Sequence, residues 1–351
     1  MKANIQEEYG SQAAKYQRIV IARHGGPEVL QAVEEDLPEP RAGEVRVKVL
    51  AAGVSAYDLM HRRSGSLPGS PRLPYTPGED IVGVVDRLGD GVTSLDPGQR
   101  VAGYPRCGGY AESICLPASE LVPVPDGVDP AHAVCLVANY LTAHLMLHRT
   151  ANIQSGERIL VHGAAGGVGS ALLELGRVAG LEMFGTASKY NHELVTALGA
   201  TPIDYRTEDF VERIRTLTGD GVNAVFDPIG GARQLWRSYR ALCKGGRLVW
   251  FGVAAATKDG LRIIPLTLLT VFLLKLLPGG KQTPLTPNLA EFAPAHPDWY
   301  RETLTELLDL LAAGTIRPAV AGRVPLAEAA RAHEMLERGG YAGKVVLVAN
   351  D

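Results

Sequence analysis

Cysteine is scarce in this chain of 351 residues, which contains only four. They are Cys107, Cys115, Cys135 and Cys243, and their spacing matches neither a zinc ribbon nor the disulfide framework of a small secreted domain. We interpret them as free thiols. A reducing compartment keeps thiols free, so we expect a cytoplasmic protein.

An excess of one charge is also lacking. The sequence has 35 Lys and Arg residues against 38 Asp and Glu residues, which gives a net charge of −3, and it contains no basic run. This balance does not provide the electropositive surface on which nucleic-acid binding depends. We therefore expect no nucleic-acid partner.

No apolar run is long enough to cross a bilayer. The most apolar stretch, residues 263–277, is interrupted by Pro265 and Lys275, and it falls short of the roughly 20 residues that a membrane span needs. We expect it to form a buried helix, an oligomer contact or a lid over a pocket. Residues 1–15 lack the apolar core of a signal peptide, and we expect a flexible N-terminal extension there.

Residues 16–133 are rich in strand signals. Short runs that alternate or are β-branched occur at 18–22, 44–51, 80–88 and 112–116, and Gly and Pro clusters separate them. Many short strands at this spacing predict a partly open β-barrel.

The pattern changes near residue 134, where strand and helix signals begin to alternate. Such alternation predicts a doubly wound parallel sheet. We assign residues 134–317 to this α/β domain, with an apolar and proline-rich insert at 263–297. The segment 318–351 holds a possible strand at 319–324, a helix and a last strand, and we expect it to return to the first domain.

A glycine-rich turn at Gly163–Gly169 joins a predicted strand to a predicted helix. Gly166 and Gly169 occupy the second and third positions of a G-x-G-x-x-G fingerprint, and Ala164 replaces the first. Small residues let the backbone approach a pyrophosphate, and the helix N-terminus supplies N–H groups. We expect Ala165, Gly166, Gly167 and Val168 to bind a dinucleotide; the alternative is a tight turn without a ligand.

The end of the next strand lacks an acid. NAD-specific sites place Asp or Glu there for the ribose hydroxyls, whereas this chain has Ser188 and Lys189. A hydroxyl and an ammonium suit a 2′-phosphate, so we expect NADPH as the cofactor. The alternative is that Lys189 is solvated and that the protein uses NAD.

Beyond these features, the sequence resembles the zinc-independent quinone reductase branch of the medium-chain dehydrogenase/reductase superfamily over about residues 17–350. The matching motifs lie at residues 51–58, 73–80, 98–101, 108–112, 139–143, 164–169, 198–200, 203–206, 227–231 and 343–347. The resemblance implies a GroES-like β-barrel domain built from both chain ends, with a Rossmann domain inserted between them and the cofactor in the cleft.

The resemblance also implies roles for further residues. Lys189 and Tyr205 match residues that hold the 2′-phosphate, and Asn139 and Thr142 match the stretch beside the nicotinamide. The nicotinamide is also bordered by the loop that Gly252 and Val253 match, and Lys344 matches a lysine near the cleft mouth.

No metal site is expected. The three positions that hold catalytic zinc in zinc-dependent members carry Ser55, Glu79 and about Ala138 here. A hydroxyl, a carboxylate and a methyl group do not form a tetrahedral zinc site.

Without zinc, the chemistry that remains is hydride transfer to an electron-poor π-system such as a quinone or an α,β-unsaturated carbonyl. The anion formed needs hydrogen-bond donors and a proton. We expect the donors in the loop Ser55–Asp58, with Tyr57 first, Ser55 beside it, and Asp58 orienting the loop. A tyrosine packed in the barrel core is an equally good interpretation of Tyr57.

Two alternatives stay open: an enoyl reductase acting on a thioester or polyketide intermediate, and an NADPH-binding protein without significant catalysis. The proton-donating Tyr of superfamily enoyl-thioester reductases is replaced here by Leu67, which disfavours a mechanism that uses it. We expect a small hydrophobic substrate and a homodimer. The 263–297 insert either caps the substrate cleft or pads the dimer interface.

Overall fold

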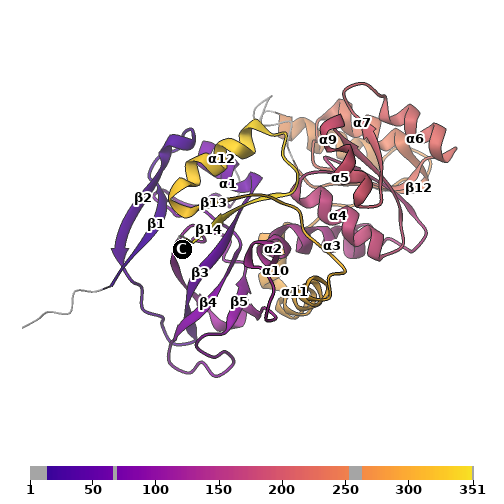
Figure 1. Cartoon of the computed structure of the whole chain (residues 1–351). Coiled ribbons are helices and arrows are strands. Elements are labelled where there is room, and N and C mark those ends of the chain that lie inside the picture. The colour runs from indigo at the N-terminus through magenta and orange to yellow at the C-terminus, as the bar shows by residue number, and fades with distance from the viewer. Residues whose placement is uncertain (1–13, 66–68, 253–262, 350–351) are drawn as a thin grey trace, which may run out of the picture.

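Two large β-sheets organise the chain in the computed structural model, which describes residues 14–65, 69–252 and 263–349. Residues 1–13 of the expected N-terminal extension, Leu67 and Val253 lie outside the described residues. Lys15, which we assigned to that extension, already belongs to the first strand, β1. Figure 1 shows the two sheets in two lobes that are joined by helices.

The first lobe is the partly open barrel. Its seven-stranded sheet has the order β13-β14-β3-β4-β5-β7, and β6 pairs with β3. The bounds are β3 Glu44–Val54, β4 Ile81–Leu88, β5 Arg100–Gly103, β6 Ser113–Pro117, β7 Leu121–Pro123, β13 Val320–Pro325 and β14 Lys344–Val348. A hairpin of β1 (Lys15–Ile21) and β2 (Leu30–Asp36) lies beside the barrel sheet, where Ile19 N–H donates to the Tyr110 carbonyl.

The C-terminal segment completes this sheet. β14 runs antiparallel to β3 and parallel to β13, and helix α12 (Ala329–Arg338) packs against β14. Residues near both chain ends therefore share one lobe (Figure 1). The possible strand at 319–324 lies in this sheet as β13.

The second lobe is the parallel sheet, with the strand order β10-β9-β8-β11-β12. Its strands are β8 Arg158–His162, β9 Glu182–Ala187, β10 Thr201–Asp204, β11 Val222–Asp227 and β12 Leu242–Trp250. Its helices are α4 Gly167–Val178, α5 His192–Ala197, α6 Phe210–Thr218 and α7 Ala232–Ala241. The α/β fold class with a GroES-like and a Rossmann part, expected from the sequence, is confirmed.

Both faces of the parallel sheet are covered. Along β8, Ile159 and Val161 join one buried cluster while Leu160 joins another. Successive side chains of a strand point to opposite faces, so the continuous apolar run Ile159–Val161 fits a sheet with two buried faces.

A long helical segment, Pro130–Thr150, joins the two cores. It comprises α2 (Pro130–Cys135), η3 (Leu136–Tyr140), α3 (Leu141–His144) and η4 (Leu145–Thr150). Among the described residues it is the one helix long and apolar enough to cross a membrane, but 72% of its apolar window is buried inside the protein. Its side chains share a cluster with Val82 of the barrel and Val161 of the parallel sheet, so it is a core helix.

The expected loop Ser55–Asp58 is wrong, because these residues begin helix α1 (Ala56–Arg63). The Ser55 side chain accepts a hydrogen bond from Asp58 N–H, and the Asp58 side chain accepts one from Ser55 N–H. This reciprocal pair is a capping box, and the spacing of a hydroxyl and an acid three residues apart is its sequence signal.

The insert at 263–297 is largely ordered along the parallel sheet. Helix α9 (Ile263–Lys275) packs against α7, and residues 282–285 form a short parallel extension beside β12 through the bridges Arg247–Gln282 and Trp250–Leu285. Helix α10 (Leu289–Ala295) then leads into α11 (Pro297–Ala312). The expectation of a buried helix here is wrong for much of α9, whose outward face is exposed.

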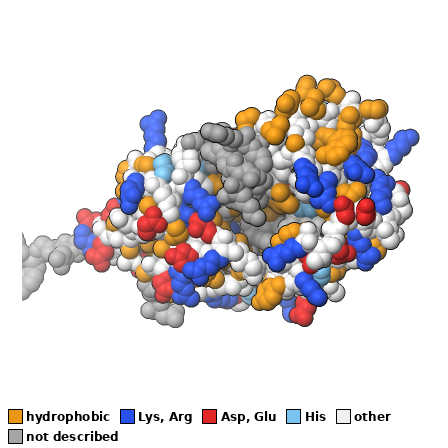
Figure 2. Space-filling model, turned by 90° about the horizontal axis from the view of Figure 1, so that it is seen from above, with side chains coloured by type: hydrophobic (Ala, Val, Ile, Leu, Met, Phe, Trp, Pro, Cys, Tyr) orange, Lys and Arg blue, Asp and Glu red, His pale blue; other side chains and the backbone are white. Residues whose placement is uncertain are grey.

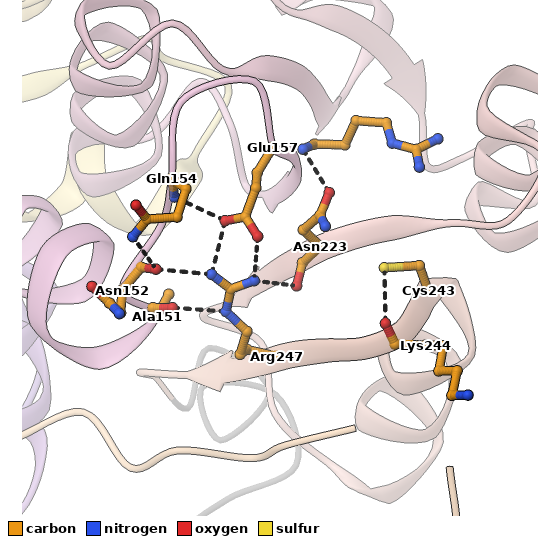
Figure 3. A network of polar contacts seen from close by, with 9 residues as sticks. Ala151, Asn152, Gln154, Glu157, Asn223, Cys243, Lys244 and Arg247 are labelled. Carbon is orange, nitrogen blue, oxygen red and sulfur yellow. Dashed lines mark hydrogen bonds and ion pairs between the residues drawn. The ribbon is translucent and has the colours of Figure 1, made fainter. Parts of the chain in front are cut away.

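One arginine links β12, the last strand of the parallel sheet along the chain, to the segment just before β8, the first. Arg247 on β12 hydrogen-bonds both carboxylate oxygens of Glu157 at 2.8 Å and the carbonyls of Ala151 and Asn152 (Figure 3). Both side chains are mostly buried, with 13% and 21% of their surface exposed. The hydrogen bonds from Arg247 lower the pKa of the Glu157 carboxyl.

Replacing Arg247 with Met is expected to lower the free energy of unfolding by about 2–3 kcal/mol at neutral pH, because Glu157 and two carbonyls lose a charged donor. The depressed pKa of Glu157 means that the pair stabilises the fold above the unfolded Glu pKa of about 4.3, and that this contribution disappears as the pH falls through the folded pKa. Urea unfolding of both proteins at several pH values measures the difference, which should shrink in acid.

The matched control is Arg338→Met, which removes the exposed pair with Glu334 on α12. It should cost less than about 1 kcal/mol. Equal stability of the Arg247→Met and unaltered proteins at neutral pH would contradict the assignment.

Candidate active-site cleft

The glycine-rich turn lies at the carboxyl end of β8, where the two lobes meet. Gly163 adopts a φ of +63°, and a Cβ on Gly169 would lie 2.2 Å from the Gly163 carbonyl oxygen. Only glycine therefore fits the tight return of the chain into α4. Gly166 caps α4 without a side chain, which leaves the N–H groups of the first helical turn accessible to an anion.

Segments from the barrel lobe and the joining helix contact this turn. Gly343 N–H, just before β14, donates to the Ala165 carbonyl at 2.8 Å. The Asn139 side-chain nitrogen lies 2.3 Å from the position that a Cβ of Gly167 would take. The structure thus brings together Ala165, Gly167 and Asn139, and Thr142 follows half-buried on the same helical segment. Figure 2 shows the surface hollowed between the lobes.

The predicted phosphate ligands gather at the ends of the next two strands. β9 and β10 are parallel and pair Ala187 with Asp204, so Ser188 and Tyr205 leave the sheet side by side. Lys189 and Tyr205 are exposed. Arg206 adds a second cation, with its guanidinium carbon 5.7 Å from the Tyr205 ring centre. Arg206 lies within the motif at residues 203–206 but was not predicted as a phosphate ligand, although the lack of an acid at the end of β9 makes each nearby cation a candidate.

Gly252 follows β12 at the same edge of the sheet. A Cβ at this position would lie 2.7 Å from the Pro228 carbonyl oxygen, and the Trp250 indole N–H donates to the Gly252 carbonyl. Gly252 is therefore held against the loop that follows β11, where Asp227 accepts from the N–H groups of Ile229 and Gly230.

On the barrel side, Asp58 is buried and fully engaged. Besides Ser55 N–H it accepts from Gly78 N–H at 2.9 Å and from the Tyr110 hydroxyl at 3.2 Å. Burial raises the pKa of Asp58, and the backbone donors oppose that rise. These contacts favour the orienting function for Asp58 over proton transfer.

Tyr57 is not a barrel-core tyrosine, because 47% of it is exposed. Burial of part of the ring and the charge of Glu79 raise its pKa. The phenol therefore stays neutral at physiological pH and offers a hydrogen-bond donor at the cleft.

Glu79 is an acid that lies close to the hydroxyl groups of Ser55 and Tyr104. Glu79 is half-buried and accepts from the Tyr104 hydroxyl at 3.0 Å, and the Ser55 hydroxyl is near enough to oppose the rise in its pKa. Burial, followed by the negative charges of Asp58 and Asp80, raises the pKa of Glu79 to about 7. From the sequence, Glu79 was expected only to be a residue that does not suit zinc at one of the three zinc positions.

Lys344 lies beside this acid and not at the cleft mouth, since only 3% of it is exposed. Its ammonium pairs with the Asp80 carboxylate at 2.7 Å. Burial alone would lower the Lys344 pKa, but Asp80 and Glu79 outweigh it and raise the pKa. A Cβ on Gly53 would lie 2.0 Å from the Lys344 side chain, so this glycine makes room for the buried cation.

The family resemblance puts the zinc positions of zinc-dependent relatives at Ser55, Glu79 and about Ala138, which offer a hydroxyl, a carboxylate and a buried methyl group. Within the described part of the chain, no three His, Cys, Asp or Glu side chains are grouped so that they could hold a metal ion. The donor set present does not suit zinc.

A barrel sheet completed by the C-terminal strand, with an inserted Rossmann sheet, defines a class of dehydrogenases. Family models agree: residues 41–126 match the alcohol dehydrogenase GroES-like domain, and residues 198–347 match the zinc-binding dehydrogenase model. The chain belongs to the quinone oxidoreductase-like branch of the medium-chain dehydrogenase/reductase superfamily.

Three relatives support this assignment. Quinone oxidoreductase of Rattus norvegicus is 31% identical over 340 residues, which cover 94% of this chain and 97% of the relative. The synaptic vesicle membrane protein VAT-1 homolog of Homo sapiens is 33% identical over 340 residues, covering 94% and 86%. The structure of Escherichia coli quinone oxidoreductase complexed with NADPH superposes with a TM-score of 0.84 at 30% identity, covering 95% of this chain and all of the other.

Proposed function

We propose that the protein is an NADPH-dependent, zinc-free reductase that transfers hydride to a quinone or to the activated C=C bond of an α,β-unsaturated carbonyl. The observation that carries the proposal is the end of β9 and β10, where Lys189 and Arg206 accompany Tyr205 and no acid follows β9. The NADPH complex of the E. coli relative supports the choice of cofactor.

The residues present fit this cofactor. The first turn of α4, with Ala165, Gly166, Gly167 and Val168, would bind the pyrophosphate, because its N–H groups lie at the cleft and no side chain blocks them. Ser188, Lys189, Tyr205 and Arg206 would hold the 2′-phosphate. Asn139, Thr142 and Gly252 would border the nicotinamide, which supplies a hydride when bound.

The barrel side would orient the acceptor. The Ser55 and Tyr57 hydroxyls can donate hydrogen bonds to a carbonyl oxygen that gains negative charge. Asp58 would hold Ser55 and the first turn of α1 in place through its three accepted hydrogen bonds, one of them from Tyr110. The substrate would be a small hydrophobic molecule.

The acceptor is tested by following loss of the nicotinamide absorbance with a quinone series, an enone series and an acyl-thioester series. We expect turnover with quinones or enones, unchanged after dialysis against a chelator, because no zinc polarises the carbonyl. Turnover confined to thioesters would instead favour an enoyl reductase. Tight NADPH binding without turnover of any acceptor would contradict the proposed function.

Lys189→Ala is expected to weaken NADPH binding about 10–100-fold, which corresponds to the loss of one charged hydrogen bond of about 1.5–3 kcal/mol. NADH has no 2′-phosphate, so its affinity should change less than about twofold. Fluorescence titration with both nucleotides measures the two ratios. Lys48→Ala, an exposed lysine on β3, is the matched control; equal losses for NADPH and NADH would contradict the assigned contact.

We also infer that the protein is a homodimer and that a second copy covers α9. Much of the outward face of this helix is apolar, with exposed side chains at Leu266, Leu268, Leu269, Phe272 and Leu273. Leu276, Leu277 and, beside β12, Leu285 extend the patch. Monomeric proteins rarely leave an apolar patch of this extent in water, and the extension at 282–285 lies at the edge of the parallel sheet, where a second sheet can pack. A cytoplasmic location accords with the four free thiols.

The double variant Leu269→Glu/Phe272→Glu is expected to convert the dimer to a monomer, because four buried glutamates would face each other across a twofold interface. Light scattering after gel filtration measures the mass, and circular dichroism confirms the fold. Leu217→Glu, on the exposed side of α6, is the matched control and should remain dimeric. A monomeric unaltered protein would contradict the dimer, and a raised KM in a variant that stays dimeric would favour the cleft-cap alternative.

A further inference from the structure

Among the three acids Asp58, Glu79 and Asp80, Glu79 is the one that solvent can reach. It lies between α1 and β4 and is half-buried, whereas Asp58, Asp80 and Lys344 around it are buried. A substrate entering between the lobes therefore meets Glu79 before it meets the other acids.

The neighbouring acids are already satisfied. The Asp58 carboxylate accepts three hydrogen bonds, from Ser55 N–H, Gly78 N–H and the Tyr110 hydroxyl, and Asp80 is neutralised by Lys344 at 2.7 Å. Glu79, in contrast, has no ion-pair partner within 4.0 Å among the residues that the structure describes. In the described part of the chain, its carboxylate accepts a hydrogen bond from the Tyr104 hydroxyl, and the Ser55 hydroxyl lies nearby.

This environment favours the protonated form of Glu79. Burial and the charges of Asp58 and Asp80 raise its pKa to about 7, against the opposing charge of Lys344 and the hydrogen bond from Ser55. Efficient general acids have a pKa near the working pH. The tyrosines are weaker candidates, because burial raises the pKa of Tyr57 and that of Tyr104 above the usual range of a phenol.

We propose that Glu79 is the general acid that completes the reduction, giving its proton to the anion that hydride transfer leaves on the substrate. The inference rests on the proposed function. The C–H bond at nicotinamide C4 breaks and a new C–H or O–H bond forms on the acceptor, so NADPH is oxidised and the acceptor becomes an enolate or hydroquinone anion. The Glu79 O–H bond then breaks as the proton moves to that anion, and the carboxylate regains a proton from water through the open side of the cleft.

The remaining groups would position this acid. Tyr104 donates to one carboxylate oxygen, and Ser55, whose own oxygen accepts from Asp58 N–H, is held close to the carboxylate. Tyr57 stands beside the acid as a hydrogen-bond donor. The barrel therefore sets the proton donor with hydroxyl groups from two elements, the start of α1 and the residue that follows β5.

The test replaces Glu79 with Gln, which keeps the size and an oxygen for Tyr104 but removes the proton. With a quinone or enone that the unaltered protein reduces, kcat should fall about 100-fold or more, since general acid catalysis contributes about 10²–10⁴. The unaltered protein should lose activity as the pH rises through about 7, because its acid is then deprotonated, and Glu79→Gln should not show this fall. NADPH affinity should stay within about twofold.

Glu79→Asp is the conservative variant, and it should recover part of kcat together with the loss of activity at alkaline pH. It replaces Glu79→Gln as the test if that variant does not fold. Asp86→Asn, a carboxylate on β4 paired with Arg46, is the matched control and should leave the pH profile unchanged. If Glu79→Gln folds, an unchanged kcat and an unchanged alkaline fall in it would overturn the assignment. If it does not fold, the same result in Glu79→Asp would do so. Either result would leave the proposed function intact. An unaltered protein that binds NADPH but reduces no acceptor would overturn both.

Discussion

The buried ion pair between Lys344 and Asp80 is the interaction on which the cleft depends. It joins β14, from the end of the chain, to the segment before β4, and it lies where both side chains are almost fully out of water. Removing one partner of such a pair leaves an uncompensated buried charge that costs roughly 3–5 kcal/mol. The residue before Lys344, Gly343, also donates to the Ala165 carbonyl in the phosphate turn. Two consecutive residues thus hold the barrel lobe and the turn together.

The same pair sets the charge balance of the cleft. Asp58, Glu79 and Asp80 place three carboxyl groups near one ammonium, so full ionisation would leave an excess of negative charge in a poorly solvated region. Asp80 has the ammonium beside it, and Asp58 has its hydrogen-bond donors. Glu79 has neither an ion-pair partner nor an N–H donor in its described contacts. The negative charges around it therefore raise its pKa.

The fold was largely predictable because its signals are local and periodic. The continuous apolar run of β8, the glycines at Gly166 and Gly169 and the strand–helix alternation each specify one element, and the structure confirms the class that they imply. Helix α1 was missed because strand signals surround it, although the capping box at Ser55 and Asp58 marks its start. The exposure of α9 could not be predicted, since an apolar helix has the same sequence pattern whether the core or a partner covers it.

The candidate site was predictable only in its cofactor half. Ligands of a dinucleotide follow strand ends in one continuous domain, so sequence order places Ala165, Lys189 and Tyr205 near one another. The barrel half of the site brings together Ser55, Glu79, Tyr104 and Lys344. The first and the last of these are 289 residues apart in the sequence. Their proximity depends on strand pairing, which a single sequence does not display. The raised pKa of Glu79 could not be predicted from the sequence, because it depends on burial and on neighbours that only the fold brings to this residue.

The proposed acid at Glu79 could serve a reductase in the way that a metal ion serves a zinc-dependent dehydrogenase. In a reduction, negative charge develops on the acceptor as hydride arrives, and either a metal ion or a proton can neutralise it. A metal ion stabilises an oxygen anion without being consumed, and so serves alcohol oxidation as well as the reverse reaction. A carboxylic acid gives up its proton and favours reduction while its pKa stays near the ambient pH. Glu79, at the position of a zinc-binding histidine in zinc-dependent relatives, would therefore bias the proposed enzyme toward reducing acceptors whose product anion takes up a proton.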